Sequence, residues 1–297
     1  MKIFAATYTP MKEDLSLNPE VIRPYSNYLD DKGVHGIFIN GSTGDFTSLT
    51  LPERKVILEY WAKEKGDLIL INHVGHLSLN AAKELAIDSR GKADAIAAIA
   101  PFYFKPGNLQ QLVEYCDEIA SCAPEIPFFY YHLPALTQVD FNMIEFSRIA
   151  SKRIPNFGGI KFTQNDLVAF QEVNANAGEK EIYFGVDEAF LPSLSVGAQG
   201  WVGSTFNHLM PLYEAIADNF YEGNFPEARS LQSLAIKFVE TLGAPGGFNG
   251  GGKGFMRELG IDCGPSRFPH HTLNKEEILS IRQAFKKNGL SEYLAYS

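Results

Sequence analysis

Eight short apolar segments recur along the chain. Each is five to seven residues long and nearly continuous in apolarity, which is typical of parallel strands covered on both faces. Their starts lie 19 to 33 residues apart, so each interval has room for a helix. The segments are residues 3–8, 36–40, 68–74, 95–100, 127–132, 158–163, 181–186 and 200–204.

Helical patterns occupy the intervals between these segments. Thr50 and Glu53 form a capping box, in which each side chain can satisfy a free amide of the other residue, ahead of a helix to residue 65. Pro24 lies inside the first expected helix and should kink it or delay its start. The other expected helices are residues 78–90, 109–120, 143–152, 166–177 and 188–196.

This alternation predicts an α/β fold, a closed (β/α)8 TIM barrel, over residues 1–222. No strand pattern follows the eighth segment, so we expect residues 223–297 to form a helical C-terminal extension. An open doubly wound sheet is the alternative, but no glycine fingerprint follows the first strand. The expected late helices are residues 211–221, 226–242, 253–259 and 275–287.

Composition narrows the class of protein. With 297 residues, 45% of them hydrophobic, the chain can build one large core. Its net charge of -9 opposes binding to nucleic acid or to an anionic membrane. The longest apolar run, residues 95–104, is about half of a membrane span. Residues 1–10 carry no secretory signal pattern, so we expect a cytoplasmic protein with three reduced cysteines.

Two further patterns imitate ligand sites. Residues 247–254 approach a phosphate-binding loop, but Gly254 stands where the magnesium-binding hydroxyl belongs and no strand precedes the run. The histidine pairs at 73–76 and 270–271 have no cysteine or carboxylate at ligand spacing. We therefore expect no nucleotide and no metal at these places.

Catalytic side chains of a barrel enzyme lie at the C-terminal ends of its strands, where this chain offers one amine, Lys161. Burial favours the neutral form of a lysine, and a neutral amine can attack a ketone to form an imine. Alternatively, Lys161 reaches solvent at the barrel mouth or pairs with Asp187 or Glu188. Position in the sequence leaves these alternatives open.

Two neighbouring strand ends add groups that suit this chemistry. Tyr131 ends the fifth strand, and its phenol could exchange protons beside Lys161, although an isolated tyrosine also fits a core position. Ser42 and Thr43 lie in Gly-Ser-Thr-Gly after the second strand, where hydroxyls and flexible backbone amides could hold a carboxylate or phosphate. The same four residues also describe many ordinary turns.

Together these motifs resemble the pyruvate-dependent class I aldolases of the N-acetylneuraminate lyase and dihydrodipicolinate synthase superfamily. The resemblance spans nearly the whole chain, and YYHLPALT together with HVGHLSL at 73–79 is most similar to the eukaryotic type of N-acetylneuraminate lyase. The matching motifs are GSTGD at 41–45, YYHLPALT at 130–137, GGIKFTQNDL at 158–167, FGVDE at 184–188 and VGSTFN at 202–207.

The resemblance implies a role for each group. Lys161 would form the Schiff base, Tyr131 would act as acid and base, and Ser42 with Thr43 would hold the substrate carboxylate. Tyr103 would enter a proton relay of a neighbouring subunit in a homotetramer, although it also fits an interface or core position. The positions that match sugar contacts are Thr163, Gly185, Asp187, Glu188, Gly203 and Ser204.

The implied reaction is reversible cleavage of N-acetylneuraminate to N-acetylmannosamine and pyruvate, with no metal and no diffusible cofactor. Leu136 stands where dihydrodipicolinate synthases carry an arginine for the second substrate's carboxylate, which disfavours that activity. Asp45 and Gln138 replace a common glutamate and glycine of the family and leave substrate detail open. The alternatives are a sister aldolase for another 2-oxo sugar acid and a catalytically silent sialate-binding module.

Overall fold

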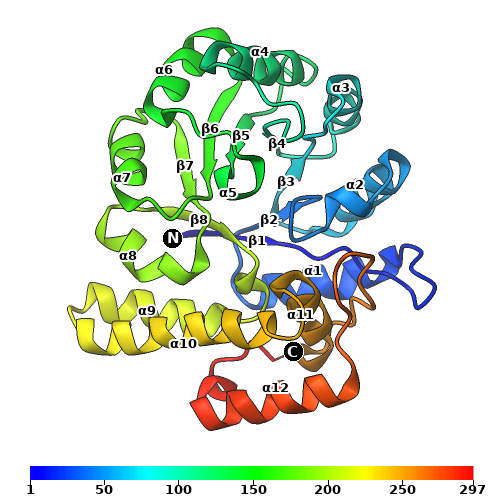
Figure 1. Ribbon diagram of the computed structural model, residues 1–297, viewed down its shortest axis with the longest axis vertical. Helices are drawn as coiled ribbons and strands as arrows, with labels where there is room; N and C mark the ends of the chain where they lie inside the picture. Colours follow the sequence, from blue (N-terminus) through cyan, green and yellow to red (C-terminus); the bar gives the residue numbers. More distant parts are fainter. Residues whose placement is uncertain (297) are drawn as a thin grey trace.

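Eight parallel strands form a closed barrel in a computed structural model that describes residues 1–296 (Figure 1). The strands follow one another in sequence order, and β1 pairs with both β2 and β8. All eight predicted strands are confirmed, and closure excludes the open sheet. They are β1 (Lys2–Ala6), β2 (Gly36–Ile39), β3 (Ile69–His73), β4 (Ala95–Ile99), β5 (Phe128–His132), β6 (Phe157–Phe162), β7 (Glu181–Phe184) and β8 (Gly200–Gly203).

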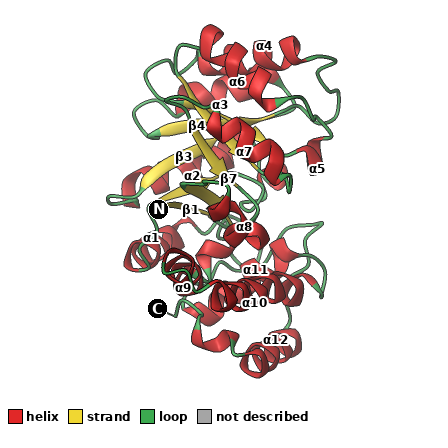
Figure 2. Cartoon of the chain, turned by 90° about the vertical axis from the view of Figure 1, so that its left-hand side faces the viewer, coloured by secondary structure: helices red, strands yellow, loops and turns green. Residues whose placement is uncertain are grey.

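Helices cover the outside of the barrel, as the alternation predicted (Figures 1 and 2). The capping box is present, with the Thr50 amide donating to Glu53 Oε2 at 2.9 Å. Pro24 is the third residue of α1, which begins only after a 3-10 turn, so the proline delays the helix. The helices are α1 (Ile22–Asp31), α2 (Leu51–Glu64), α3 (Leu79–Asp88), α4 (Leu109–Ala120), α5 (Pro134–Thr137), α6 (Met143–Arg153), α7 (Leu167–Ala175), α8 (Phe190–Ser195) and α9 (Met210–Tyr221).

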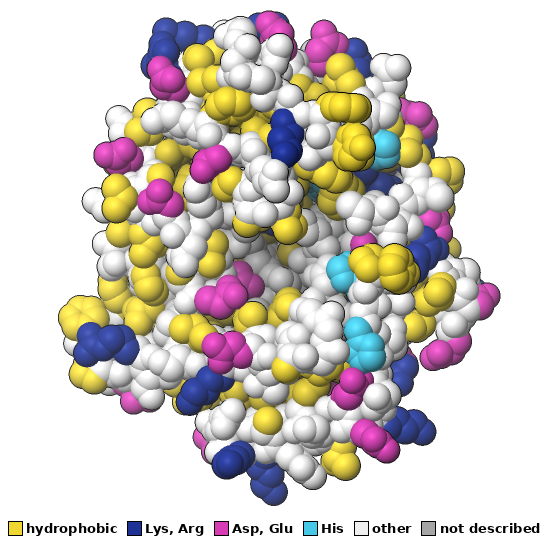
Figure 3. Space-filling view, in the orientation of Figure 1, with side chains coloured by type: hydrophobic (Ala, Val, Ile, Leu, Met, Phe, Trp, Pro, Cys, Tyr) yellow, Lys and Arg dark blue, Asp and Glu magenta, His cyan; other side chains and the backbone are white. Residues whose placement is uncertain are grey.

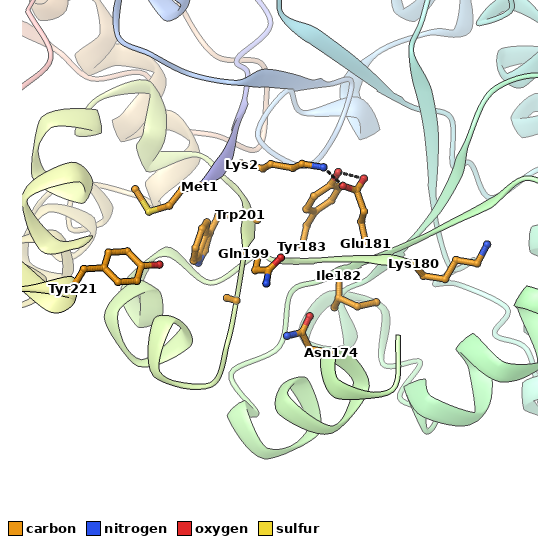
Figure 4. A pocket seen from close by; sticks show the side chains of 12 residues that line it. Met1, Lys2, Asn174, Lys180, Glu181, Ile182, Tyr183, Gln199, Trp201 and Tyr221 are labelled. Carbon is orange, nitrogen blue, oxygen red and sulfur yellow. Dashed lines mark hydrogen bonds and ion pairs between the residues drawn. The ribbon is translucent and has the colours of Figure 1, made fainter. Parts of the chain in front are cut away.

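Aromatic side chains close the N-terminal end of the barrel. The Tyr183 ring stacks on Phe129 with centroids 5.3 Å apart, and its hydroxyl donates to Glu181, which also pairs with Lys2. Figure 4 shows this end, where Lys2, Glu181 and Tyr183 border a cavity of about 410 Å³ that Trp201 also lines. Because stacked rings and the Lys2–Glu181 ion pair join strands at this end, it stabilises the barrel, and the strand ends opposite are left for chemistry.

Three helices follow the barrel and pack beside it as a second helical layer (Figure 2). They are α10 (Phe225–Gly243), α11 (Phe248–Phe255) and α12 (Lys275–Asn288). The Phe238 ring of α10 stacks on Phe285 of α12 with centroids 5.1 Å apart. Among residues 1–296, no helix combines the length and the apolarity of a membrane span.

The start of α11 corrects one prediction. We expected a helix over residues 253–259, but α11 begins at Phe248 and a 3-10 turn follows it at Met256–Leu259. The run 247–254 that imitates a phosphate loop is therefore mostly helix. Glycine is a poor helix former, which hides this element in the sequence. The structure needs it here, because a Cβ on Gly251 would lie 1.9 Å from the carbonyl oxygen of Leu242 in α10.

This close approach predicts the effect of one methyl group. Alanine is a better helix former than glycine, yet Gly251→Ala should lower the free energy of unfolding by about 2 kcal/mol, because the added Cβ forces α11 away from α10. Gly107→Ala is the control, since its Cβ meets only the end of the Gln111 side chain, and should stay within about 0.5 kcal/mol. Urea unfolding measures both, and equal stability of the two variants would contradict the close-packing account.

Candidate functional site

A cavity of about 260 Å³ lies at the C-terminal ends of the strands. Figure 3 shows this face of the molecule, which is hollowed near its centre over the barrel. Ten of the eleven residues singled out in the sequence line this one cavity: Ser42, Thr43, Tyr131, Lys161, Thr163, Gly185, Asp187, Glu188, Gly203 and Ser204. Tyr103 is the exception and is described below.

Lys161 extends from β6 into the cavity and is 5% exposed. Its Nζ lies 4.0 Å from the ring centroid of Phe38 and 4.1 Å from that of Tyr131. Burial lowers the pKa of the amine to about 7, and the more distant charge of Asp187 opposes this only in part. Within the described chain, Lys161 forms no ion pair, and its side chain is almost entirely buried. The amine is therefore available as a nucleophile near neutral pH.

Tyr131 lies beside Lys161 because the two residues are paired in register between β5 and β6. Its hydroxyl lies 3.3 Å from Ser42 Oγ, which joins the tyrosine to the Gly-Ser-Thr-Gly loop. Burial raises the pKa of the phenol to about 12, against the opposing effect of the nearby Ser42 and Thr163 hydroxyls. At neutral pH the phenol keeps its proton, so it can donate to a developing oxyanion next to the amine.

A buried layer below Tyr131 fixes its ring. The His73 ring meets it edge to face with centroids 5.9 Å apart, and His73 Nδ1 hydrogen-bonds the Asn40 carbonyl at 2.8 Å. Burial, followed by the charge of Arg54, lowers the pKa of His73, so the imidazole is neutral. Arg54 donates to the carbonyls of His73 and Gly75. His73 is a buried core residue, and no pattern in the sequence indicated that it supports Tyr131.

Asp187 provides a hydrogen-bond acceptor in another part of the cavity wall. Its Oδ2 accepts hydrogen bonds from the Thr205 amide at 2.9 Å and from Thr205 Oγ1 at 2.8 Å. A Cβ on Gly203 would lie 1.7 Å from Asp187 Oδ1, so only glycine permits this placement. Burial raises the pKa of Asp187 to about 6, and the exposed Glu188 beside it adds to the rise. This wall can accept hydrogen bonds from several hydroxyls of a polyol.

The loop at 41–45 is held from both sides. Thr9 Oγ1 donates to the Gly44 carbonyl at 2.7 Å, and Asn249 Nδ2 donates to the Ser42 carbonyl at 2.7 Å. Asn249 comes from α11, and Val239 and Phe248 from the same helical layer also line the cavity. Sequence reasoning missed all three, because nothing in the chain indicates that helices after the barrel reach its mouth.

Tyr103 lies outside this cavity. It is 72% exposed on the loop after β4, beside Phe104, which is 85% exposed. A second, mostly apolar cavity of about 210 Å³ adjoins the first and shares Ser42, Leu136 and Asn249 with it. In a single chain, Tyr103 therefore takes no part in the site that the other residues form.

The part of the chain that the structure describes holds no cluster of three His, Cys, Asp or Glu side chains suited to a metal ion. His270 and His271 contact Asp45 and Glu277, respectively, on separate elements. Cys116 is a buried free thiol.

Comparison with known proteins agrees with this geometry. Residues 1–288 match the dihydrodipicolinate synthetase family. The N-acetylneuraminate lyase of Xenopus tropicalis is 39% identical over 93% of this chain and 92% of its own, and that of Homo sapiens is 39% identical over 92% and 88%. The solved N-acetylneuraminate lyase of Proteus mirabilis superposes with a TM-score of 0.92 at 34% identity, covering 96% of this chain and 97% of its own. The resemblance of the motifs is thus confirmed, and the chain belongs to the dihydrodipicolinate synthetase family.

Proposed function

We propose that this protein is a class I aldolase that cleaves N-acetylneuraminate reversibly to N-acetylmannosamine and pyruvate. The observation that carries the proposal is the buried, unpaired amine of Lys161, packed on the Tyr131 ring at the C-terminal mouth of the barrel. Two proteins named N-acetylneuraminate lyase are 39% identical to the chain, which supports N-acetylneuraminate as the substrate. A catalytically silent binding module does not require a lysine whose pKa is lowered to about 7.

The reaction begins at the ketone of the open-chain sugar acid. The Lys161 amine attacks this carbon while Ser42 and Thr43 hold the adjacent carboxylate, and loss of water leaves a protonated imine. Tyr131, 3.3 Å from Ser42, passes protons to and from the carbinolamine oxygen. The aromatic faces of Phe38 and Tyr131 lie against the nitrogen and favour its positive charge.

Bond cleavage uses this cation as an electron sink. Tyr131 becomes a phenolate when it protonates the departing water. This phenolate, directly or with the substrate carboxylate, then removes the proton from the hydroxyl two carbons away, and the carbon-carbon bond breaks. The bonding electrons move to the imine and leave an enamine on Lys161, and N-acetylmannosamine departs. Protonation of the enamine and hydrolysis then release pyruvate and the free amine. Every proton and electron pair is supplied by the chain, the substrate or water, so the reaction requires no cofactor.

The part of the cavity wall that contains Asp187 and Glu188 favours binding of a polyol. Asp187 and Glu188 accept hydrogen bonds from hydroxyls, and the positions that would complete this half are Thr163, Gly185, Gly203 and Ser204. Leu136 cannot bind a second carboxylate as an arginine would, which disfavours aspartate semialdehyde. A sister aldolase acting on another 2-oxo sugar acid would use the same amine, so a comparison of cleavage rates for several such acids distinguishes the two.

Assembly completes the proposal. The exposed Tyr103 and Phe104 pair and the apolar cavity beside Ser42 suit one another across a subunit interface. We infer a homotetramer in which Tyr103 reaches the proton relay of a neighbouring subunit. A cytoplasmic location stays a prediction of the sequence.

Removal of the Tyr131 hydroxyl tests the acid and base role. Tyr131→Phe keeps the ring against Lys161 and should lower kcat by ~10²-fold or more, with substrate binding largely retained. Steady-state cleavage of N-acetylneuraminate measures kcat and KM. Tyr130→Phe is the control, because that ring is buried outside the cavity. A Tyr131→Phe enzyme with unchanged kcat and a raised KM would refute the role.

The pKa of Lys161 predicts a pH dependence. The neutral amine is the nucleophile, so the rate at which pyruvate labels Lys161 in the presence of cyanoborohydride should rise as pH increases through about 7 and then level off. Single-turnover labelling from pH 5.5 to 9.5 measures this rate. A rate that still rises without levelling off at pH 9.5, as expected for the ordinary lysine pKa of 10.5, would mean that burial does not activate the amine.

Mixed oligomers test the role of Tyr103. Lys161→Ala and Tyr103→Phe subunits should each have low activity, whereas co-expression of the two should recover about a quarter of the wild-type activity. Random pairing makes half of the dimers mixed, and each mixed dimer keeps one site with Lys161 from one subunit and Tyr103 from the other. No recovery, in oligomers shown by mass spectrometry to be mixed, would place Tyr103 in its own subunit's site. A Tyr103→Phe enzyme with wild-type activity would place Tyr103 outside the reaction.

A further inference from the structure

Two amide side chains of the helical layer after the barrel hold the two halves of the candidate site. Gln232 of α10 is 5% exposed and lies behind the Asp187 and Glu188 wall. Asn249 of α11 lies at the mouth of the cavity against the loop of Ser42. Neither residue lies at a strand end, and the sequence analysis assigned neither of them to the site, although Asn249 falls within the run 247–254 that imitates a phosphate loop.

Gln232 uses both ends of its amide on the turn after β7. Its Nε2 donates to the Glu188 carbonyl at 3.1 Å and to the Asp187 carbonyl at 3.5 Å, while its Oε1 accepts from the Leu191 amide at 2.7 Å. The side chain therefore spans the short 3-10 turn Asp187–Ala189 and the first turn of α8. These bonds fix the backbone from which the two acceptor carboxylates project.

Asn249 acts on the other half of the site. The Ser42 carbonyl that it binds lies in the same loop as the hydroxyls and amides that would hold the substrate carboxylate. The bond joins residues 207 positions apart, so nothing local in the chain substitutes for it. Because Gly251 brings α11 into direct contact with Leu242 of α10, the two amides belong to one packed unit.

We propose that α10 and α11 position the two half-sites separately, Gln232 the polyol-binding turn and Asn249 the carboxylate-binding loop. This inference rests on the proposed aldolase function. Both are positioning residues, since neither amide needs to touch the reacting atoms. Loss of one should weaken binding of one substrate of the condensation reaction and leave the other substrate nearly unaffected.

The test measures the two substrates independently. Asn249→Asp keeps the side-chain shape but removes the donor, and it should raise the pyruvate concentration that half-saturates borohydride labelling of Lys161 by about tenfold. Gln232→Glu keeps the acceptor for Leu191 and loses the donor, and it should raise KM for N-acetylmannosamine, measured at saturating pyruvate, by about tenfold. In Asn249→Asp the KM for N-acetylmannosamine, and in Gln232→Glu the half-saturating pyruvate concentration, should change by less than about twofold.

Control variants distinguish these separate effects on the two substrates from a general loss of structure. Asn224→Asp makes the same charge change at an exposed position before α10 and should leave both constants within about twofold. If Gln232→Glu does not fold, Gln232→Met keeps the side-chain length and gives the same readout. Variants that shift both constants equally, or neither, in an enzyme whose wild type labels and condenses normally, would overturn the inference. A wild type that pyruvate does not label would instead overturn the proposed function.

Discussion

The burial of one lysine amine without a carboxylate partner is the constraint on which the rest of the site depends. Burial of such a group lowers the stability of the folded protein, because an ammonium ion loses its hydration and gains no ion-pair partner. Here the amine is surrounded by the π faces of Phe38 and Tyr131, with Asp187 beyond ion-pair distance. The environment tolerates a cation yet does not require one. That balance suits a residue that must be neutral to attack a ketone and positive once the imine forms.

The barrel supplies this environment through its asymmetry. At its N-terminal end, stacked aromatic rings and the Lys2–Glu181 ion pair join the strands, whereas the C-terminal end opens into the cavity of the candidate site. The register of β5 and β6 sets Tyr131 beside Lys161, and the layer of His73 and Arg54 keeps that ring in place. Stability and chemistry are thus assigned to opposite ends of the same strands.

The sequence predicted most of the barrel because each strand shows in the local pattern of apolar residues. Strand ends then indicated Lys161, Tyr131 and the Ser42 loop, since the fold itself dictates where such ends meet. The parts that it missed depend on long-range contacts. Asn249 lies in a glycine-rich helix of weak propensity, and Gln232 looks like any amide on a helix until its carbonyl partners are known. The exposure of Tyr103 likewise follows from the assembled chain and not from its neighbours in sequence.

Trapping of the covalent intermediate tests the central claim most directly. The protein is incubated with N-acetylneuraminate, reduced with borohydride and mapped by peptide mass spectrometry. The account predicts a stable pyruvate-sized adduct on Lys161, because that mass requires both imine formation and cleavage of the carbon-carbon bond. Labelling by pyruvate alone would indicate an aldolase for another sugar acid. An unlabelled Lys161 with both compounds would contradict the account.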